Sequence, residues 1–555
     1  MAMKLSTRRF VIGLAVFSGL FFALLLCFFF YNLSTTTSEY SIGGVVAPHQ
    51  LFYNFINGRP FQDSLFATHG GDAGFSYNPY PFIHIYAIHV YLTPYIFAIL
   101  WSVWPNIYWL YGLVIVAAYA SMVVFAWKTL SYLSPKTFKS KTIVGIALLM
   151  ASGFLITFQT NAQLMLFGAP FMLAAYYFLL RHRKGWFLFS VILLCLTSED
   201  LAMVAVTFAL YIFLFERKEK TYAFMAWGFA VPYLTVLFLF IQPAARSELV
   251  LTTASTTASV VAKVSSFFPP DIPELLIGFG PVIAFLPAFA IVCLLFGRPD
   301  VAWVRVAGLV LLAPFPHWGE SAVVGAGHHL MPVIVFLYIA LIIVIGKTPD
   351  IDVSKLSFSI VNNLLLLGCC AIFILGNCRV MASNLPDPLR LYICKLVGKT
   401  TVANRIEISL LERRANQKVI ETIGEIPKNS SLVYLTNSSV EGFIAGRSNI
   451  WKFPDYYDAA DFLIMQPNAR QSSFSFSVSG VKTVVDAIAT GKTTIDNDAA
   501  IEMDSVKAIV HHLVVEQKSH HVVIESPLVV LLERIQKIPM QSPPSTIGFG
   551  WLHNL

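Results

Sequence analysis

The chain has 555 residues, of which 56% are hydrophobic and only 12% are charged. Soluble domains are about 45–50% apolar and about 25% charged, so this composition excludes an ordinary soluble protein and places most of the chain in lipid. In a soluble protein the net charge of +7 would suggest a nucleic-acid partner. Here the basic residues lie in short loops between apolar runs, so they are interpreted as determinants of membrane topology, and no nucleic-acid partner is expected.

Residues 1–30 predict an uncleaved membrane helix. Lys4, Arg8 and Arg9 precede an apolar run at 10–30, which is too long for a signal peptide and is followed by no small-residue cleavage site. The N-terminus is therefore expected in the cytoplasm. Several of the other apolar runs are shorter than the roughly 20 residues that a span needs, so we expect flanking residues to extend them. These runs are 107–127, 142–159, 166–180, 185–197, 201–215, 222–241, 281–297, 301–314, 329–346 and 357–375.

One further apolar run, 81–104, is ambiguous, and positive charge decides its assignment. If it lies along the membrane surface, the strongly basic loops, such as the one around Lys136, face the cytoplasm. If it crosses the membrane, the same loops face outward, against the positive-inside rule. We therefore predict one or two juxtamembrane helices within a long first outer loop, 32–106, and about 11 spans in total. The outer loops before residue 376 then hold only Arg59, Arg246 and Lys263 as basic residues.

The sequence changes in character after residue 375, and an odd number of spans places this last segment outside the cytoplasm. We predict a transmembrane domain over 1–375 and an extracytoplasmic soluble α/β domain over 376–555, attached to a plasma (bacterial inner) membrane. Cys378 and Cys394 lie in this segment and could form a disulfide. The predicted elements are short buried strands at 431–435 and 462–465 and helices at 482–489 and 505–512.

Acidic residues and histidines gather on the predicted outer side, and the spans are nearly free of ionisable groups. Glu199 and Asp200 stand out, because two adjacent carboxylates in a short turn lie close to the hydrocarbon boundary, where an ionised group needs a partner. One interpretation is metal coordination or organisation of a phosphate site, since hard divalent cations prefer carboxylate oxygens. The other is that the pair ends one helix and N-caps the next.

The remaining candidates are weaker. His69 and Asp72 flank a flexible Gly pair, which suits a carboxylate approaching a ligand but is also ordinary turn chemistry. His89 opens an apolar helix, and His328 with His329 opens the tenth predicted span, where histidines are commonly interfacial. No His-x3-His or Cys-x2-Cys spacing supports a zinc site.

Several stretches together carry a family resemblance through their order along the chain. They are Asn57-Gly58-Arg59-Pro60-Phe61, His89 with Pro105, Ser198-Glu199-Asp200, His328 to Pro332, Ser431 to Tyr434, Gly446-Arg447, Phe453-Pro454 and Ala460 to Ile464. In this order they resemble the DUF2079 family of predicted membrane proteins, which looks like a branch of the GT-C superfamily of integral-membrane glycosyltransferases. The resemblance covers most of the chain, although no single element is specific.

The chain also departs from the family pattern. Ser41 and His49 stand where the family places acidic residues just after the first span, Ser198 replaces a Lys, and Leu92 replaces a Pro. Since GT-C enzymes generally rely on an acid early in that loop, two alternatives follow. Either Asp72, Asp63 or Glu39 takes the role, or this member has lost catalysis.

The resemblance implies transfer of a sugar from a polyprenyl-phosphate donor to an unidentified acceptor at the outer face. Asp72 would act as the base or a metal-linked carboxylate, Glu199 and Asp200 would organise a divalent cation (Mg²⁺ or Mn²⁺) or the phosphate, and Arg59 would contact the phosphate. His69, His89, His328 and His329 would line the substrate site. The alternative is a non-catalytic scaffold or partner subunit that keeps the fold. A transporter is disfavoured, because transporters place ionisable groups at the membrane midplane.

Overall fold

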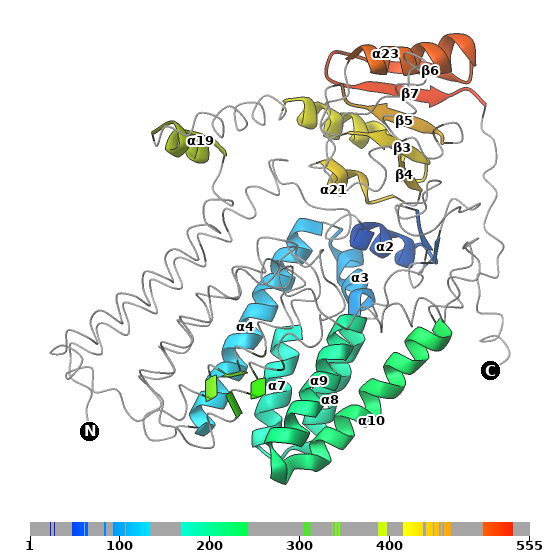
Figure 1. Cartoon of the computed structure of the whole chain (residues 1–555). Coiled ribbons are helices and arrows are strands. Elements are labelled where there is room, and N and C mark those ends of the chain that lie inside the picture. The colour runs from blue at the N-terminus through cyan, green and yellow to red at the C-terminus, as the bar shows by residue number, and fades with distance from the viewer. Residues whose placement is uncertain are drawn as a thin grey trace, which may run out of the picture.

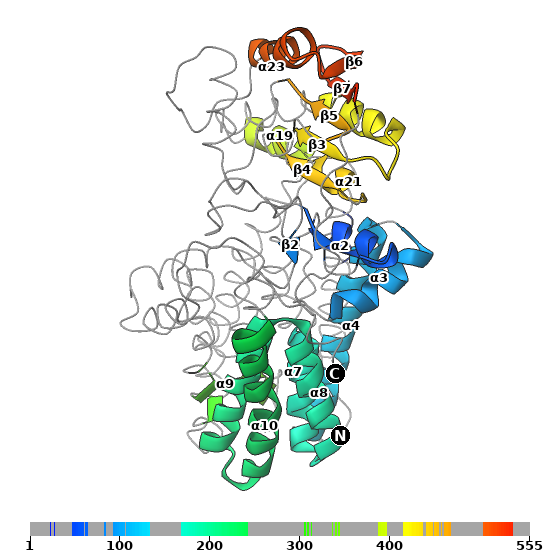
Figure 2. The same ribbon diagram turned by 90° about the vertical axis from the view of Figure 1, so that its right-hand side faces the viewer.

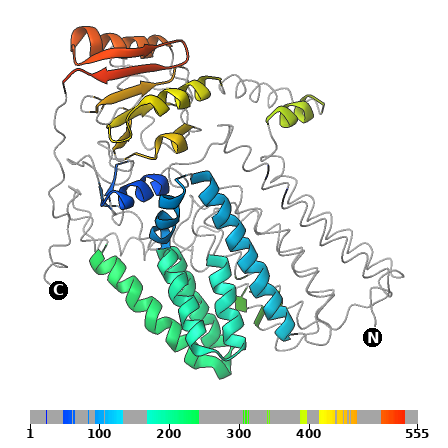
Figure 3. The ribbon, with the colours of Figure 1, turned by 180° about the vertical axis from the view of Figure 1, so that it is seen from behind.

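The computed structural model describes residues 47–59, 62–64, 83–84, 93–105, 107–133, 168–241, 387–396, 414–436, 440–447, 449–453, 460–467 and 503–536, with a few single residues elsewhere. This part of the chain is mostly helical, as predicted. The helices form a bundle at one end, a small layer of short elements covers that bundle, and a five-stranded sheet lies beyond this layer (Figure 1). The same three-tiered order is visible from the side (Figure 2) and from behind (Figure 3).

The described bundle consists of apolar helices in the predicted order. They are α4 (Ile107–Leu133), α7 (Gly168–Leu180), α8 (Lys184–Thr197), α9 (Glu199–Phe215) and α10 (Lys220–Val236), with the 3-10 turn η4 (Arg217–Glu219) before α10 and the π-helix η5 (Leu237–Ile241) after it. Two described stretches, Val116–Leu133 and Lys220–Ile241, are long and apolar enough to cross a membrane.

Basic residues gather at the end of this bundle that is remote from the sheet. The Lys128 ammonium of α4 lies 6.0 Å from the ring of Tyr177 on α7, and the Arg181 guanidinium lies 5.5 Å from the ring of Tyr132. The C-terminal ends of α4 and α7 therefore lie side by side, which means that the two helices run in the same direction. The α9–α10 turn is at this same end (Figure 1). The positive-inside rule thus gives the described helices a consistent orientation.

Helix α8 differs from the expectation that flanking residues would lengthen the short runs. It contains 14 residues and stops at Ser198, so its length of about 21 Å is less than the roughly 30 Å of hydrocarbon. The physical reason is burial: Thr197, Ser198 and Glu199 are all buried inside the protein. Helix α3 packs against α8 (Figure 1). A non-helical turn is tolerated at this depth because protein, not lipid, surrounds it.

The layer above the bundle comes from the first outer loop. It consists of α2 (Ala47–Ile56), the short antiparallel pair β1 (Gln62–Asp63) and β2 (Ile83–His84), and α3 (Thr93–Val103). Helix α3 has 11 residues and a length of about 16 Å, too short to cross a bilayer. The described part of 81–104 packs against the bundle, and its assignment as juxtamembrane stays a prediction.

The C-terminal sheet has the strand order β4-β3-β5-β7-β6. Strand β3 is parallel to β4 and β5, whereas β7 is antiparallel to both β5 and β6. The predicted strands at 431–435 and 462–465 and the predicted helix at 505–512 are confirmed. The elements are β3 (Leu432–Leu435), α21 (Glu441–Ile444), β4 (Ile450–Lys452), β5 (Phe462–Met465), α23 (Met503–His511), the π-helix η10 (His512–Glu516), β6 (His520–Glu525) and β7 (Val530–Arg534).

Helices cover both faces of this sheet, which explains why its central strands are continuous apolar runs. Leu432 and Tyr434 of β3 face a core that includes Val419 and Ile423 from a helix at 414–425. The alternate residue Val433 faces the opposite core, which α23 covers. The two-residue period of a strand thus divides one apolar run between two separate cores.

Several predictions lie outside the described residues. These are the domain boundary at 375/376, the helix at 482–489, the spans at 10–30, 142–159, 281–297 and 357–375, and most of those at 301–314 and 329–346. Cys378 is also outside them, so its pairing with Cys394 stays a prediction. The short helix α19 (Asp387–Leu396) is the described element nearest to the predicted boundary.

A buried ion pair stabilises the basic end of the bundle. Glu216 ends α9 and is only 6% exposed, and its carboxylate accepts a hydrogen bond of 3.2 Å from the Tyr211 hydroxyl. The Arg305 guanidinium lies 2.7 Å from the other carboxylate oxygen. This contact joins α9 to a segment about ninety positions further along the chain and therefore restrains the packing of the later helices.

We expect Glu216→Gln to lower the thermal stability of the detergent-solubilised protein clearly. The substitution leaves the Arg305 charge without its carboxylate, which costs about 2 kcal/mol, less than for a fully buried pair because Arg305 is partly exposed. Glu219→Gln is the matched control, since Glu219 contacts only the exposed His182 in the described structure. Equal melting temperatures for the two variants would contradict a special role for Glu216.

Candidate functional site

The predicted pair Glu199 and Asp200 lies in the first turn of α9, at the end of the bundle that α3 covers. Ser198, not Asp200, is the N-cap: its hydroxyl accepts a hydrogen bond of 3.2 Å from the Leu201 amide. Of the two interpretations left open for this pair, N-capping by the pair itself is therefore wrong, because Ser198 occupies the capping position. Carboxylates in the first turn still complement the positive end of the helix dipole, and Glu199 does so from a buried position.

Among the other predicted site residues, the structure describes Arg59 and the backbone of Asp63. Arg59 follows the turn that ends α2, where Gly58 adopts a positive φ of 75° and the Arg59 amide donates to the Asn54 carbonyl. Asp63 lies in β1. His69, Asp72, His89, His328, His329 and Glu39 lie outside the described residues. Within the part of the chain that is described, no three His, Cys, Asp or Glu side chains form a group suited to a metal ion.

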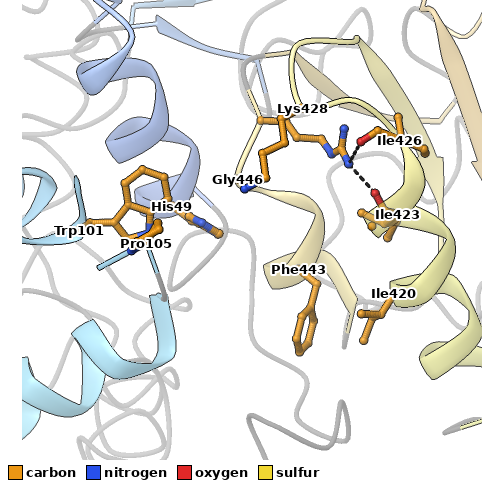
Figure 4. Close-up of a pocket in the computed structure, with 11 residues that line it drawn as sticks. His49, Trp101, Pro105, Ile420, Ile423, Ile426, Lys428, Phe443 and Gly446 are labelled. Atoms are coloured by element: carbon orange, nitrogen blue, oxygen red, sulfur yellow. Dashed lines mark hydrogen bonds between the residues drawn. The ribbon is translucent and has the colours of Figure 1, made fainter. Parts of the chain in front are cut away.

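The structure instead reveals a pocket of about 240 Å³ between the first outer loop and the C-terminal domain (Figure 4). His49 of α2, with Trp101 and Pro105 at the end of α3, forms one wall. The opposite wall belongs to the C-terminal domain and consists of Ile420, Ile423, Gly424, Ile426, Lys428, Phe443, Gly446 and Arg447. The lining therefore combines an apolar surface with basic side chains, and no acidic residue is among the described residues that form it.

A side-chain bridge holds these two walls together. The Ser64 hydroxyl donates to the Ile450 carbonyl at 2.7 Å and accepts from the Ile450 amide at 3.0 Å. Gln50 fixes Ser64 in turn: its amide nitrogen donates to the Ser64 hydroxyl at 2.5 Å, and its amide oxygen accepts from the Ser64 amide at 3.2 Å. Since Gln50 follows His49 in α2, the bridge determines how closely the His49 wall approaches the domain.

Arg447 is buried in the opposite wall. Its guanidinium donates to the carbonyls of Ile423 at 2.6 Å, Ile426 at 2.8 Å and Pro427 at 2.6 Å, which satisfies the C-terminal end of the helix at 414–425. Burial lowers the pKa of Arg447 to about 10, an effect that Tyr53 partly opposes. The positive charge is thus held at the pocket by carbonyl dipoles, without a carboxylate among the residues that line it.

Gly446 and His49 lie close together across the pocket. A Cβ atom at position 446 would lie 2.9 Å from His49 Nε2, so only a glycine fits against the imidazole without displacement. On its other side the His49 ring meets Trp101 edge to face, with 5.4 Å between the ring centroids. His49 is therefore held between the two walls, and its position depends on the absence of a side chain at Gly446.

Sequence reasoning noticed three parts of this pocket without connecting them. It identified His49 as standing where the family pattern has an acid, and Pro105 and Gly446-Arg447 as parts of the family resemblance. It missed Lys428 altogether. No local sequence pattern could connect these parts, because the two residues that bring the walls together, Ser64 and Ile450, are 386 positions apart.

We expect Gly446→Ala to loosen the docking of the C-terminal domain on the first outer loop, because the added methyl group displaces the His49 ring. The double variant Gly446→Ala/His49→Ala restores space and should recover much of the loss. Hydrogen exchange at residues 47–56 and 441–453 measures the docking in the full-length protein. As a control, Gly424→Ala adds a methyl group where no described atom lies within 4 Å. An unchanged exchange rate in Gly446→Ala would contradict the contact.

Comparison with known proteins supports the membrane assignment. The family model described as "Predicted membrane protein (DUF2079)" matches residues 31–479. Among solved structures, the chain is similar to ArnT from Cupriavidus metallidurans bound to undecaprenyl phosphate, with 10% sequence identity, coverage of 95% of this chain and 99% of that chain, and a TM-score of 0.48. No curated protein matches the sequence.

Proposed function

Because the chain belongs to the DUF2079 family of predicted membrane proteins, we propose that it is a GT-C-type membrane glycosyltransferase. It transfers a sugar from a polyprenyl-phosphate donor to an acceptor on the outer face of a bacterial inner membrane. In this proposal the chain crosses the membrane about 11 times, with its N-terminus in the cytoplasm and its C-terminal domain in the periplasm or outside the cell.

One observation carries the proposal: the pocket between the first outer loop and the C-terminal domain combines basic groups with an apolar wall. The elements that carry its lining, α2, α3 and the C-terminal domain, lie at the end of the bundle opposite the basic turns (Figure 1), which would be the outer end under the positive-inside rule. A lipid-linked donor presents complementary groups. Its phosphate suits the basic side chains, and its hydrocarbon chain suits the apolar wall. Neutralising the phosphate charge in a partly water-excluded site eases its departure as a leaving group.

Helix α3 offers a path between the pocket and the lipid. Ile96, Ile99, Leu100 and Val103 are exposed and recur at the spacing of one helical face, and Val103 is 84% exposed. In a juxtamembrane helix such a face contacts acyl chains. Trp101 on the same helix lines the pocket. A lipid tail that follows α3 would therefore bring its headgroup to the cavity.

The predicted carboxylates supply the acid–base chemistry in this proposal. Asp72 would accept the proton of the acceptor hydroxyl, and Arg59 would contact the donor phosphate. The carboxylate donors Glu199 and Asp200 suit Mg²⁺ or Mn²⁺, but consecutive residues of a helix point about 100° apart. A cation would therefore bind only one of the two carboxylates. The cation would contribute by neutralising the charge of the phosphate.

A non-catalytic scaffold or partner subunit is the second candidate, and one observation favours it. His49 occupies a position where the family pattern has an acid, and its ring is packed between Trp101 and Gly446. A side chain held in this way stabilises an interface. On this view the C-terminal domain is a docking module whose first partner is the outer loop of its own chain.

Donor consumption separates the two candidates. We expect the purified parent to consume a polyprenyl-phosphate-linked sugar from a broad donor panel, and Asp72→Asn to lower the rate about 100-fold or more, the usual contribution of a general base. Glu199→Gln and Asp200→Asn should also lower it, whereas Glu219→Gln at the opposite end of the bundle should not.

A parent that consumes none of the donors, or three site variants that match the parent, would count against the enzyme. A partner protein that co-purifies in stoichiometric amount would instead favour the scaffold.

A further inference from the structure

The charges around the pocket are unbalanced. Arg447 is 4% exposed and lines the cavity with Lys428 and His49, while the other described residues of the lining are uncharged. Placing a cation away from water is unfavourable unless an opposite charge or hydrogen bonds compensate. The three carbonyls that Arg447 contacts supply hydrogen bonds, but a carbonyl carries only a partial charge. Lys428 then brings a second full positive charge to the same cavity.

The simplest alternative is that Arg447 serves only to cap the helix at 414–425. This accounts for its three hydrogen bonds but not for the cavity beside it or for Lys428. At about 240 Å³ the cavity exceeds the roughly 30 Å³ share of one water several times over, so it has room for a phosphoryl group. Figure 4 shows His49 and Lys428 on opposite sides of this space.

We propose that the pocket binds a phosphate group between His49 on the first outer loop and Lys428 with Arg447 on the C-terminal domain. The assignment of a lipid as the source of that phosphate rests on the proposed function; the phosphate site itself does not. Phosphate oxygens accept charge-assisted hydrogen bonds from all three side-chain types. The apolar groups of Ile420, Phe443 and Trp101 lie beside the phosphate and contact whatever the phosphate carries.

A phosphate in this position joins two segments that are distant in sequence. It therefore acts with the Ser64 bridge: the ligand binds tightly only when the domain is docked, and by linkage it stabilises the docked arrangement. Occupancy of the site should accordingly slow hydrogen exchange at α2 and at the segment that contains Gly446, in addition to any effect on activity.

Calorimetric titration of the full-length protein in detergent tests the site with three probes: farnesyl phosphate, farnesol and inorganic phosphate. We expect farnesyl phosphate to bind, and Lys428→Ala to weaken its binding about tenfold, the equivalent of one charge-assisted hydrogen bond. Lys428→Glu should weaken it further. Lys418→Ala is the matched control, because Lys418 lies on the neighbouring helix, pairs with Glu421 and does not line the pocket.

The probes also distinguish the sources of the phosphate. Binding of inorganic phosphate as tight as that of farnesyl phosphate supports the site and assigns it to soluble phosphates. The phosphate site would be overturned if farnesol bound as tightly as farnesyl phosphate. It would also be overturned if the Lys428 variants bound farnesyl phosphate as tightly as the parent. Lys428 is exposed and contributes no core contact, so its variants should fold, and the melting temperature checks this.

Failure of the site and failure of the proposed function give different results. If phosphate binding depends on Lys428 but the protein consumes no donor, the result supports the phosphate site and counts against the glycosyltransferase. If Lys428→Glu leaves donor consumption unchanged, the result supports the glycosyltransferase and overturns the phosphate site.

Discussion

The docking of residues 47–64 on the C-terminal sheet depends on the Ser64 hydroxyl. Strand β4 is the edge of the C-terminal sheet, and an edge strand presents backbone donors and acceptors that need partners. Ser64 satisfies both groups of Ile450 with one oxygen atom, and Gln50 holds that oxygen in place. The first outer loop thus completes the edge of a sheet that is formed almost four hundred positions later, and the pocket is the space left beside this bridge.

The short helices below this bridge follow from the same arrangement. Helix α8 ends at Ser198 because the protein layer above it replaces lipid around the turn. That layer contains α3, which contacts both α8 and α2 (Figure 1). Each tier therefore provides the surroundings that the next one requires: α3 covers the buried turn of Glu199, α2 covers α3, and the C-terminal domain rests on α2.

Local pattern was enough to predict the elements that bury a regular face. The apolar runs at 185–197 and 201–215 became α8 and α9 almost to the residue, and 462–465 became β5. Contacts between remote segments leave no such pattern, so the pocket was not predictable. The cap at Ser198 was missed for a different reason: Ser and Asp are both good N-caps, and sequence alone did not separate the cap from the acidic first turn that follows it.

The electrostatics of the pocket bear on whether the C-terminal domain only docks or also binds. An interface that evolved for docking alone is stabilised by pairing each buried cation with an acid, since an uncompensated buried charge is costly. Here Arg447 is buried against carbonyls, Lys428 adds charge of the same sign, and the described lining offers no acid to either. An anionic ligand compensates the buried charge of Arg447 and pairs with the exposed Lys428. The arrangement is therefore easier to explain as a binding site that also docks than as a docking surface alone.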